Sequence, residues 1–476
     1  MNKRIRVKVV IIGAGSAGIS AMRQISRQTD DFIIIDKGPL GTTCASVGCM
    51  PSKALIHIAR QFYERKQFAD AGIRGGENLS LDLPAVLAHV RAKRDIFSGS
   101  MEKLTRKLGG SKLIIGQARV LDPHSVQVDD IIYEADAIII ATGASPVIPA
   151  EWRRDFGERL LTSDTIFEQT RLASRIAVLG LGPIGLELGQ ALARLGIEVT
   201  GYSSRPMIGG LTDPEVNHAA LDSLRKEFTI HTGVRAAVKL DGDSLLAGEG
   251  ANAAEVDQVL LSTGTRPNLR NLGMENLGVE LDDQGMPPFD PLTMQVGELP
   301  VYIAGDVNGH RPILHEALDD GFIAGRNALA AKAQHYCRRT SLKIVFSDPQ
   351  IIAVGHPLSA LEEREIAIGS VDFADQSRAM IEGSNRGLLR VYADTSSGVL
   401  LGAEAACPGA EHFGHLLAWA MQRKLTVAQL LQLPFYHPVE EEAIRTALRD
   451  AAKQLHGTAI PSDLALCGSA PEQPLH

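Results

Sequence analysis

The sequence has 476 residues, a formal net charge of -8, and 45% hydrophobic and 22% charged residues, which at roughly 100 to 200 residues per domain predicts three or four globular domains. No long run carries charges of one sign, so nucleic acids and anionic membrane surfaces are poor candidate partners, and no apolar run approaches the ~18 residues that cross a bilayer. Five cysteines are too few for an extracellular disulfide framework, so we expect a soluble cytoplasmic protein in which any disulfide is catalytic.

The chain opens with a strand, a glycine-rich turn and a helix. The apolar segment RVKVVIIG leads into GAGSAG, and FIIID supplies the next strand, which predicts a dinucleotide-binding βαβ unit within residues 1–148. Gly13 permits the tight turn, Gly15 lets the backbone approach a pyrophosphate, and Gly18 allows close packing of helix on strand. Asp36, at the end of the second strand, can accept hydrogen bonds from an adenosine ribose. The alternative is that these residues only form a turn and cap a strand.

Two cysteines follow in the segment GTTCASVGCMPSK. Apolar residues at helical spacing after Pro51 predict a helix from Met50 onward. Cys49 therefore lies at a helix N-terminus, where the dipole and free N–H groups favour a thiolate, and Cys44 can reach outward. The alternatives are two buried free thiols or half of a zinc site, but no second Cys or His pair with zinc spacing accompanies them.

A second strand, turn, helix and strand run through RIAVLG, GLGPIG, LELGQALARLG and EVTGYSS, within a predicted domain at 149–270. Gly180, Gly182 and Gly185 repeat the glycine pattern and predict a second dinucleotide site. Ser203 stands where an NAD-binding fold usually has Glu, and a serine or Arg205 could bind a 2'-phosphate. Because Gly185 is at least as common with NAD, the choice between NAD and NADP stays open.

The rest of the chain contains a central segment, a further domain and a tail, which differ in their predicted secondary structure. The turns ATGASP (141–146) and STGTRP (262–267) mark the ends of the two units. The strand VYIAGD and a helix from HEALDDG form a central segment at 271–340, and short strands such as LKIVF and GLLRVYAD with the helix HFGHLLAWAMQRK predict an α+β domain at 341–456. Residues 457–476 are rich in Pro, Ser, Ala and Gly and predict a flexible tail.

The segment FYHPVEEEAIRTAL places His437 before a proline and Glu442 at the start of a predicted helix. A carboxylate can hold an imidazole in one tautomer and stabilise its protonated form, which gives a base for a thiol. Taken alone, His437 is better interpreted as a loop or core histidine. The dithiol segment is what favours the acid–base role.

Together these motifs resemble the class I pyridine nucleotide-disulfide oxidoreductases, the flavoprotein family that contains dihydrolipoamide dehydrogenase, glutathione reductase and mercuric reductase. The resemblance reaches to about residue 455 and rests on both glycine motifs, the dicysteine segment, VYIAGD and the His-Pro-to-Glu motif in this order. It implies an α/β fold with two Rossmann-like domains, for FAD and for NAD(P), followed by a C-terminal α+β dimerisation domain in an obligate homodimer.

The resemblance also implies a role for each residue at the redox centre. Cys49 would be the thiol nearest the flavin and Cys44 the thiol that exchanges with substrate. Lys53 would lie near the flavin and pair with Glu187, which lies under the nicotinamide.

Further roles follow from the same resemblance. His437 and Glu442 would reach the disulfide of the other subunit, Asp306 would bind the ribityl chain, and the helix near Ala317 would direct N–H groups at the flavin pyrimidine. The implied FAD contacts are Gly13, Gly15, Gly18, Asp36, Thr43, Lys53, Thr142, Gly143, Asp306 and Ala317. The implied NAD(P) contacts are Gly180, Gly182, Gly185, Glu187, Ser203 and Gly264.

The chain departs from the family pattern in several places. The usual double glycine before the first cysteine is Gly41-Thr42, the loop between the cysteines reads Ala-Ser, and a turn that usually carries glutamate has Gln350. These departures concern the choice of substrate more than the chemistry.

The other cysteines carry no predicted role. Mercuric reductase uses a C-terminal cysteine pair, whereas Cys467 stands alone in this tail, which disfavours that activity. Cys337 and Cys407 are expected to be buried small apolar side chains, and no metal site is predicted.

The leading functional prediction is dihydrolipoamide dehydrogenase activity, in which a dithiol reduces the Cys44–Cys49 disulfide, His437 takes a proton, and electrons pass through FAD to the nicotinamide. The substrate would be a small dithiol or a lipoyl carrier protein. One alternative is an NADPH-dependent reductase of glutathione or another low-molecular-weight disulfide. Another is a flavin-binding docking subunit of a multienzyme complex, which the intact motifs disfavour.

Overall fold

The computed structural model describes residues 3–242, 244–456, 463 and 464. The chain forms two compact units: unit 1 comprises Met1–Ile58, Ser80–Leu172 and Thr263–Arg338, and unit 2 comprises Ala59–Leu79, Ala173–Ser262 and Arg339–His476. The predicted flexible tail, with Cys467, falls outside the described residues except at 463 and 464. Within the described part of the chain, no helix combines the length and the apolar character of a membrane span.

The main sheet of unit 1 has the strand order β3-β2-β1-β6-β5-β4, and β17 also pairs with β6. Strands β3, β2, β1, β6 and β17 are parallel, while β4, β5 and β6 pair antiparallel. The bounds are Lys3–Ile12 (β1), Phe32–Asp36 (β2), Leu113–Ile115 (β3), Ala118–Asp122 (β4), Ser125–Val128 (β5), Ile131–Ile140 (β6) and Val301–Ile303 (β17). Ile12 lies opposite Ile35 and Ile140, so the glycine turn, Asp36 and the segment from residue 141 leave the sheet at one edge.

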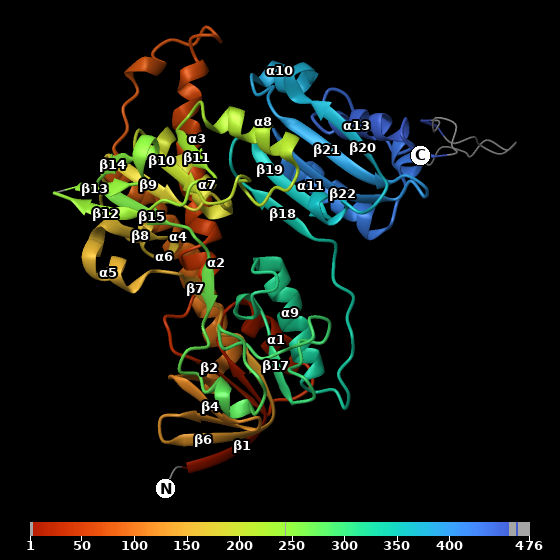
Figure 1. The fold of residues 1–476 in the computed structure, drawn as a ribbon. Helices are drawn as coiled ribbons and strands as arrows, with labels where there is room; N and C mark the ends of the chain where they lie inside the picture. Colours follow the sequence, from red (N-terminus) through yellow and green to blue (C-terminus); the bar gives the residue numbers. More distant parts are fainter. Residues whose placement is uncertain (1–2, 243, 457–462, 465–476) are drawn as a thin grey trace, which may run out of the picture. The chain divides into compact units, whose positions relative to one another are not determined.

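Both faces of this sheet are covered, which explains why β1 is apolar at successive positions. Val9 and Ile11 lie in the core beneath helices α1 (Ser16–Ile25) and α9 (Leu314–Asn327), whereas Val10 and Ile12 lie in the core on the opposite face. Strand side chains alternate between faces, so the last four residues of β1, positions 9–12, which are buried on both faces, leave no position for a polar residue. Helices α1 and α9 lie side by side (Figure 1).

Two short strands join the turns that the sequence places after each βαβ unit. Strand β7 (Ala144–Pro146) pairs antiparallel with β16 (Thr265–Pro267). The other elements of unit 1 are α2 (Thr43–Ser46), α4 (Leu83–Gly109), α5 (Ala150–Phe156), β8 (Leu160–Thr162) and α6 (Ser163–Ile166), and α3 (Cys49–Glu64) continues along the chain into unit 2.

The first sheet of unit 2 contains the parallel order β11-β10-β9-β15. Its elements are β9 (Arg175–Leu179), α7 (Pro183–Arg194), β10 (Glu198–Ser203), α8 (Pro214–Leu224), β11 (Thr229–Thr232) and β15 (Gln258–Leu261). An antiparallel sheet of β12 (Val238–Asp241), β13 (Ser244–Ala247) and β14 (Ala254–Val256) follows α8 and β11 in the chain. The predicted strand, glycine turn, helix and strand are confirmed.

The C-terminal part of unit 2 is an antiparallel sheet of order β18-β19-β22-β21-β20, with α11 packed on β18, β19 and β22, and α13 on β20 and β21 (Figure 1). The bounds are Leu342–Val345 (β18), Gln350–Gly355 (β19), Ile366–Asp372 (β20), Ser377–Glu382 (α10), Leu388–Asp394 (β21), Leu400–Cys407 (β22), Ala410–Gln422 (α11), Val427–Leu431 (α12) and Glu442–Ala452 (α13). The predicted α+β domain is confirmed.

Candidate active site

The three glycines of the first motif differ in what surrounds them. A Cβ on Gly13, whose φ is +107°, would lie 2.3 Å from the carbonyl oxygen of Ala141, and one on Gly18 would lie 1.9 Å from the carbonyl oxygen of Gly13. A Cβ on Gly15 would meet no atom within 4 Å. Packing therefore requires Gly13 and Gly18, while Gly15 leaves open space at the start of α1, where N–H groups of a helix terminus favour a phosphate.

Asp36 is held at the carboxyl end of β2 by two backbone donors. Its Oδ2 accepts from Ala14 N at 2.7 Å and its Oδ1 accepts from Gly38 N at 2.7 Å. Each carboxylate oxygen has two lone-pair sites, so both can accept a further hydrogen bond from a ribose hydroxyl. The role predicted for Asp36 requires such free acceptor sites.

The segment after β6 supplies a polar group that lacks a protein partner. Among the described residues, the buried Oγ1 of Thr142 makes no hydrogen bond, and a buried hydroxyl without a partner is unfavourable. Asn268 fixes the backbone here, since its Nδ2 donates to Thr142 O and its N donates to Gly143 O, both at 3.0 Å. The orphaned hydroxyl and the open space at Gly15 fit FAD binding at this edge.

A buried ionic cluster supports the turn that carries Asp306. Oδ2 of Asp320 accepts from Gly305 N at 3.1 Å, and Oδ1 accepts from Arg338 at 2.5 Å. Arg338 also donates to Glu316 at 2.5 Å. Burial, reinforced by the charge of Asp320, raises the pKa of Asp306. No sequence pattern indicated this cluster, because its members are not spaced as a motif.

Helix α9 begins at Leu314, and its first N–H groups have no carbonyl four residues earlier within the helix. The N–H of Ala317 already donates to Ile313 O at 2.9 Å. The groups that can point out of the helix are therefore those of 314–316, just before the predicted residue.

The cysteine segment forms two helices in succession. Cys49 is the first residue of α3, at the helix N-terminus that the sequence predicted. Cys44 lies in the short helix α2, which the sequence did not predict. Hydrogen bonding to Cys49 and burial raise the pKa of the Cys44 thiol. Cys49, at the N-terminus of α3, is the position of the pair where the helix dipole stabilises negative charge. Lys53 follows one turn later in α3.

The residue before this segment has an unusual backbone. Thr42 has φ of 62° and ψ of 144° and is the N-cap of α2, where its hydroxyl accepts from Ala45 N at 3.4 Å. A β-branched residue with positive φ is a genuine outlier. The departure from the family's double glycine therefore places threonine where the backbone favours glycine, directly before Thr43.

The second glycine motif repeats the geometry of the first. Gly180 has a φ of +94°. A Cβ on Gly185 would lie 1.9 Å from Gly180 O, whereas one on Gly182 would meet nothing within 4 Å. The open space again lies at the start of a helix, here α7, which fits a second dinucleotide. Gly264, with φ of +108°, also has open space where a Cβ would lie.

Ser203 ends β10 with its hydroxyl already engaged. Oγ donates to Arg205 O at 2.9 Å and accepts from Arg205 N at 3.2 Å. Its one proton is used within this turn, so the expectation that Ser203 donates to a 2'-phosphate is not supported. Ser204 and Arg205, which follow it, are exposed.

Glu187 lies on the second turn of α7 and is buried. Its Oε1 accepts from the backbone N–H of Phe346 at 3.0 Å, which holds the carboxylate against the segment that precedes β19. This bond was not foreseen from the sequence.

The histidine and glutamate near the C-terminus form the predicted pair. Nδ1 of His437 lies 2.9 Å from Oε2 of Glu442, the first residue of α13. A carboxylate only accepts, so Nδ1 carries the proton and Nε2 keeps the lone pair that can take a proton from a thiol. The His437 side chain is 71% exposed. This pair belongs to unit 2, whereas the dithiol belongs to unit 1.

Of the cysteines without a predicted role, the two that the structure describes differ. Cys407 is fully buried, as expected, and burial raises its pKa. The same expectation was wrong for Cys337, which is exposed because it lies in the irregular segment between α9 and β18, outside either core.

The comparisons with known proteins agree with this architecture. A family model described as pyridine nucleotide-disulphide oxidoreductase matches residues 7–325, and the dimerisation domain of that family matches residues 342–448. Dihydrolipoyl dehydrogenase of Thermus scotoductus is 30% identical over 474 residues, covering 95% of this chain and 98% of that protein. Mercuric reductase of Streptomyces lividans is 30% identical over 453 residues, covering 90% and 92%.

Solved structures agree as well. LpdA from Mycobacterium tuberculosis has a TM-score of 0.80 and 25% identity, covering 94% of this chain and 99% of that chain. The flavoprotein disulfide reductase RclA from Escherichia coli has a TM-score of 0.79 at 21% identity and shares the fold. The resemblance that the motifs indicated is thereby confirmed. The chain belongs to the pyridine nucleotide-disulphide oxidoreductase family, and it is a flavoprotein disulfide oxidoreductase with FAD and NAD(P) as cofactors.

Proposed function

We propose that this protein is a dihydrolipoamide dehydrogenase, which oxidises dihydrolipoamide to lipoamide and reduces NAD to NADH. The observation that carries the proposal is the Cys44–Cys49 dithiol, with Cys49 at the first residue of α3 and the pKa of Cys44 raised. Supporting it, relatives that match nearly the whole chain are dihydrolipoyl dehydrogenases. The mercuric reductase of Streptomyces lividans is equally identical.

In the proposed reaction, Nε2 of His437 removes a proton from one substrate thiol, and the resulting thiolate attacks Sγ of Cys44 in the oxidised enzyme. The Cys44–Cys49 bond breaks, and Cys49 leaves as a thiolate that the N-terminus of α3 stabilises. The second substrate thiol then attacks the mixed disulfide, which releases the cyclic disulfide and leaves Cys44 reduced. Bound FAD and nicotinamide supply the path by which the electron pair leaves the dithiol.

We propose that the enzyme works as a homodimer in the cytoplasm and accepts a lipoyl group on a separate carrier protein. The dimerisation domain supports the homodimer. So does the exposure of His437 in the single chain, because a general base is effective where water is excluded by a partner surface.

An NADPH-dependent reductase of glutathione or another small disulfide is the second candidate. The observation in its favour is the end of β10, where no carboxylate stands and Ser204 and Arg205 are exposed. Arginine pairs with a 2'-phosphate, whereas a carboxylate there selects the free ribose of NAD.

The first test measures dihydrolipoamide oxidation by the FAD-loaded protein with NAD and with NADP, beside glutathione disulfide reduction with NADPH. Fast NAD-linked turnover of dihydrolipoamide is expected. NADPH-linked glutathione turnover would instead favour the second candidate, and the absence of both activities would refute both.

Two variants test the assigned residues. Cys49→Ser should retain FAD but lose dithiol turnover, and wild-type rates would refute the role of Cys49. His437→Ala should lower dithiol turnover by ~10²-fold or more while leaving electron transfer from NADH to an artificial acceptor intact. Equal loss of both activities would contradict the acid–base role.

A further inference from the structure

Helix α7 binds segment 346–348 through three side chains on one face. Glu187 accepts from Phe346 N at 3.0 Å. Gln190 accepts from Asp348 N at 2.8 Å and donates to Asp348 O at 2.7 Å. Arg194 donates to Oδ2 of Asp348 at 2.8 Å. Positions three and four apart share a helix face, so these bonds fix a single register between the helix and the segment.

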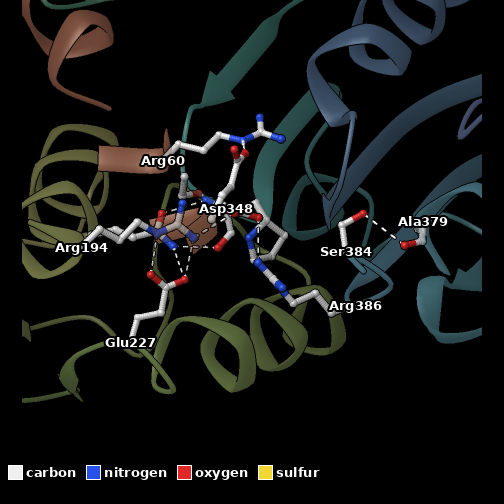
Figure 2. A network of polar contacts seen from close by, with 11 residues as sticks. Arg60, Arg194, Glu227, Asp348, Ala379, Ser384 and Arg386 are labelled. Atoms are coloured by element: carbon white, nitrogen blue, oxygen red, sulfur yellow. Dashed lines mark hydrogen bonds and ion pairs between the residues drawn. The ribbon is translucent and has the colours of Figure 1, made fainter. Parts of the chain in front are cut away.

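Asp348 is also held from the other side. Nη2 of Arg386 donates to its Oδ1 at 2.8 Å, so each carboxylate oxygen has its own guanidinium partner (Figure 2). Burial opposes ionisation of this carboxyl, but Arg386 and Arg194 outweigh it and hold the pKa of Asp348 below its ordinary value. Asp348 is therefore a charged residue that cannot turn without breaking an ion pair.

Arg194 is itself fully engaged. It donates to both carboxylate oxygens of Glu227, at 2.6 and 2.7 Å, and its side chain is 3% exposed. Gln190 donates to the same carboxylate at 2.9 Å, and the ring of Tyr63 lies 4.3 Å from the guanidinium. Figure 2 shows Arg194 between Glu227 and Asp348. The planar guanidinium donates to carboxylates in two different loops, a geometry that lysine cannot reproduce.

We infer that Gln190, Arg194 and Asp348 are positioning residues that hold the N–H of Phe346 against Glu187 and so fix the carboxylate for hydride transfer at the nicotinamide. This inference rests on the proposed function and on the family resemblance, which implies that Glu187 lies under the nicotinamide. Glu187 has three rotatable side-chain bonds, and its carboxylate accepts from the N–H of Phe346, in a segment that this network anchors. Release of segment 346–348 would remove the backbone N–H that donates to Glu187 Oε1 and so loosen the position of the carboxylate.

The expected loss of rate follows from how strongly a reaction depends on the position of its reacting groups. A displacement of about 1 Å at a reacting centre can cost ~100-fold in rate. The bonds of this network join α7, segment 346–348, Glu227 and Arg386, so its loss should slow the step that uses Glu187 more than the thiol step. A purely structural ion pair would instead lower both steps together with FAD content.

The test uses the FAD-loaded enzyme and stopped-flow spectroscopy to follow flavin reduction by nicotinamide and, separately, by dihydrolipoamide. Asp348→Asn should slow reduction by saturating nicotinamide ~10- to 100-fold and change reduction by dihydrolipoamide less than about twofold. The control is Arg175→Gln, which removes an ion pair to Asp257 of 2.6 Å in the same unit and should change neither rate. Parallel loss of both rates and of FAD, or no loss, would overturn the inference.

A double variant shows whether the effect passes through Glu187. Glu187→Gln should slow the nicotinamide step by itself, and adding Asp348→Asn should then cause little further loss, because the group being positioned is already impaired. Multiplicative losses would overturn the inference. If Asp348→Asn does not fold, Gln190→Met replaces it in the same experiments. This change removes the two hydrogen bonds between Gln190 and the Asp348 backbone without leaving a charge unpaired.

Amide hydrogen exchange gives a readout that needs no turnover. A peptide that covers residues 342–350 should exchange faster in Asp348→Asn than in wild type and unchanged in Arg175→Gln. Unchanged exchange in Asp348→Asn would overturn the anchoring role. If dihydrolipoamide proves not to be a substrate, the proposed function fails, but the nicotinamide rates and the exchange data still decide the role of the network.

Discussion

Replacement of Thr42 by glycine should stabilise the protein, although glycine usually destabilises. The φ of 62° and ψ of 144° at Thr42 lie near a region that essentially only glycine occupies, where a side chain costs about 1–3 kcal/mol. Replacing threonine by glycine also removes the hydrogen bond that Ala45 N donates to Thr42 Oγ1 at 3.4 Å. This loss costs roughly a few tenths of a kcal/mol. The extra freedom of glycine in the unfolded chain costs about 0.5–1 kcal/mol. With mid-range values the net gain is about 1 kcal/mol.

Alanine at the same position separates backbone strain from capping. Thr42→Ala keeps the Cβ that causes the strain and loses the hydroxyl, so it should be less stable than wild type by about 0.5–1 kcal/mol. Thermal unfolding of the FAD-loaded protein, at one protein concentration, should order the midpoints as glycine, wild type, alanine, with a rise of about 2–4 °C for glycine. A midpoint for Thr42→Ala at or above that of Thr42→Gly would refute the strain argument.

Two further predictions concern the FAD-binding unit. Gly15→Val should fold but lose FAD, measured by flavin absorbance, because its side chain enters space that no protein atom occupies. Gly18→Val should fail to fold, since its Cβ would lie 1.9 Å from a carbonyl oxygen. Equal folding of the two variants would contradict this reasoning. Burial opposes ionisation of Glu316, but Arg338 and Arg311 outweigh it and lower its pKa, so its stabilising contribution is present above the unfolded value near ~4.3 and is lost as pH falls through the lowered folded value. The difference in urea midpoint between wild type and Glu316→Gln should therefore be constant from about pH 8 to 5 and shrink below about pH 4; a constant difference to about pH 3 would rule this out.

Local patterns in the sequence predicted much of the fold. Runs of apolar residues that end in glycine turns identified β1 and β9, and the spacing after Pro51 placed Cys49 at the start of α3. These features depend on neighbouring residues, because a turn and a helix start are decided within a few positions of the chain. The pairing of His437 with Glu442 could be predicted for the same reason.

Ion pairs between distant residues could not be predicted. Arg194 and Asp348 are 154 positions apart, and no periodicity links them. Gln350 is instructive, because the sequence marked it only as a departure that concerned substrate choice. In the structure its amide both donates to Glu411 Oε1 at 3.1 Å and accepts from Glu411 N at 3.0 Å. A glutamate at position 350 could not donate to Glu411 Oε1, and its charge would repel the Glu411 carboxylate.

The unequal surroundings of the glycines have an evolutionary consequence. Gly18 and Gly185 are required by the chain's own carbonyl oxygens, whereas Gly15 and Gly182 face only open space. Genetic drift in a duplicated copy that no longer binds nucleotides would therefore erase Gly15 and Gly182 first and leave Gly18 and Gly185 intact. In descendants of this chain, the two kinds of glycine would be substituted at different rates. Substitution of the middle glycine of each motif would indicate that its ligand is no longer bound.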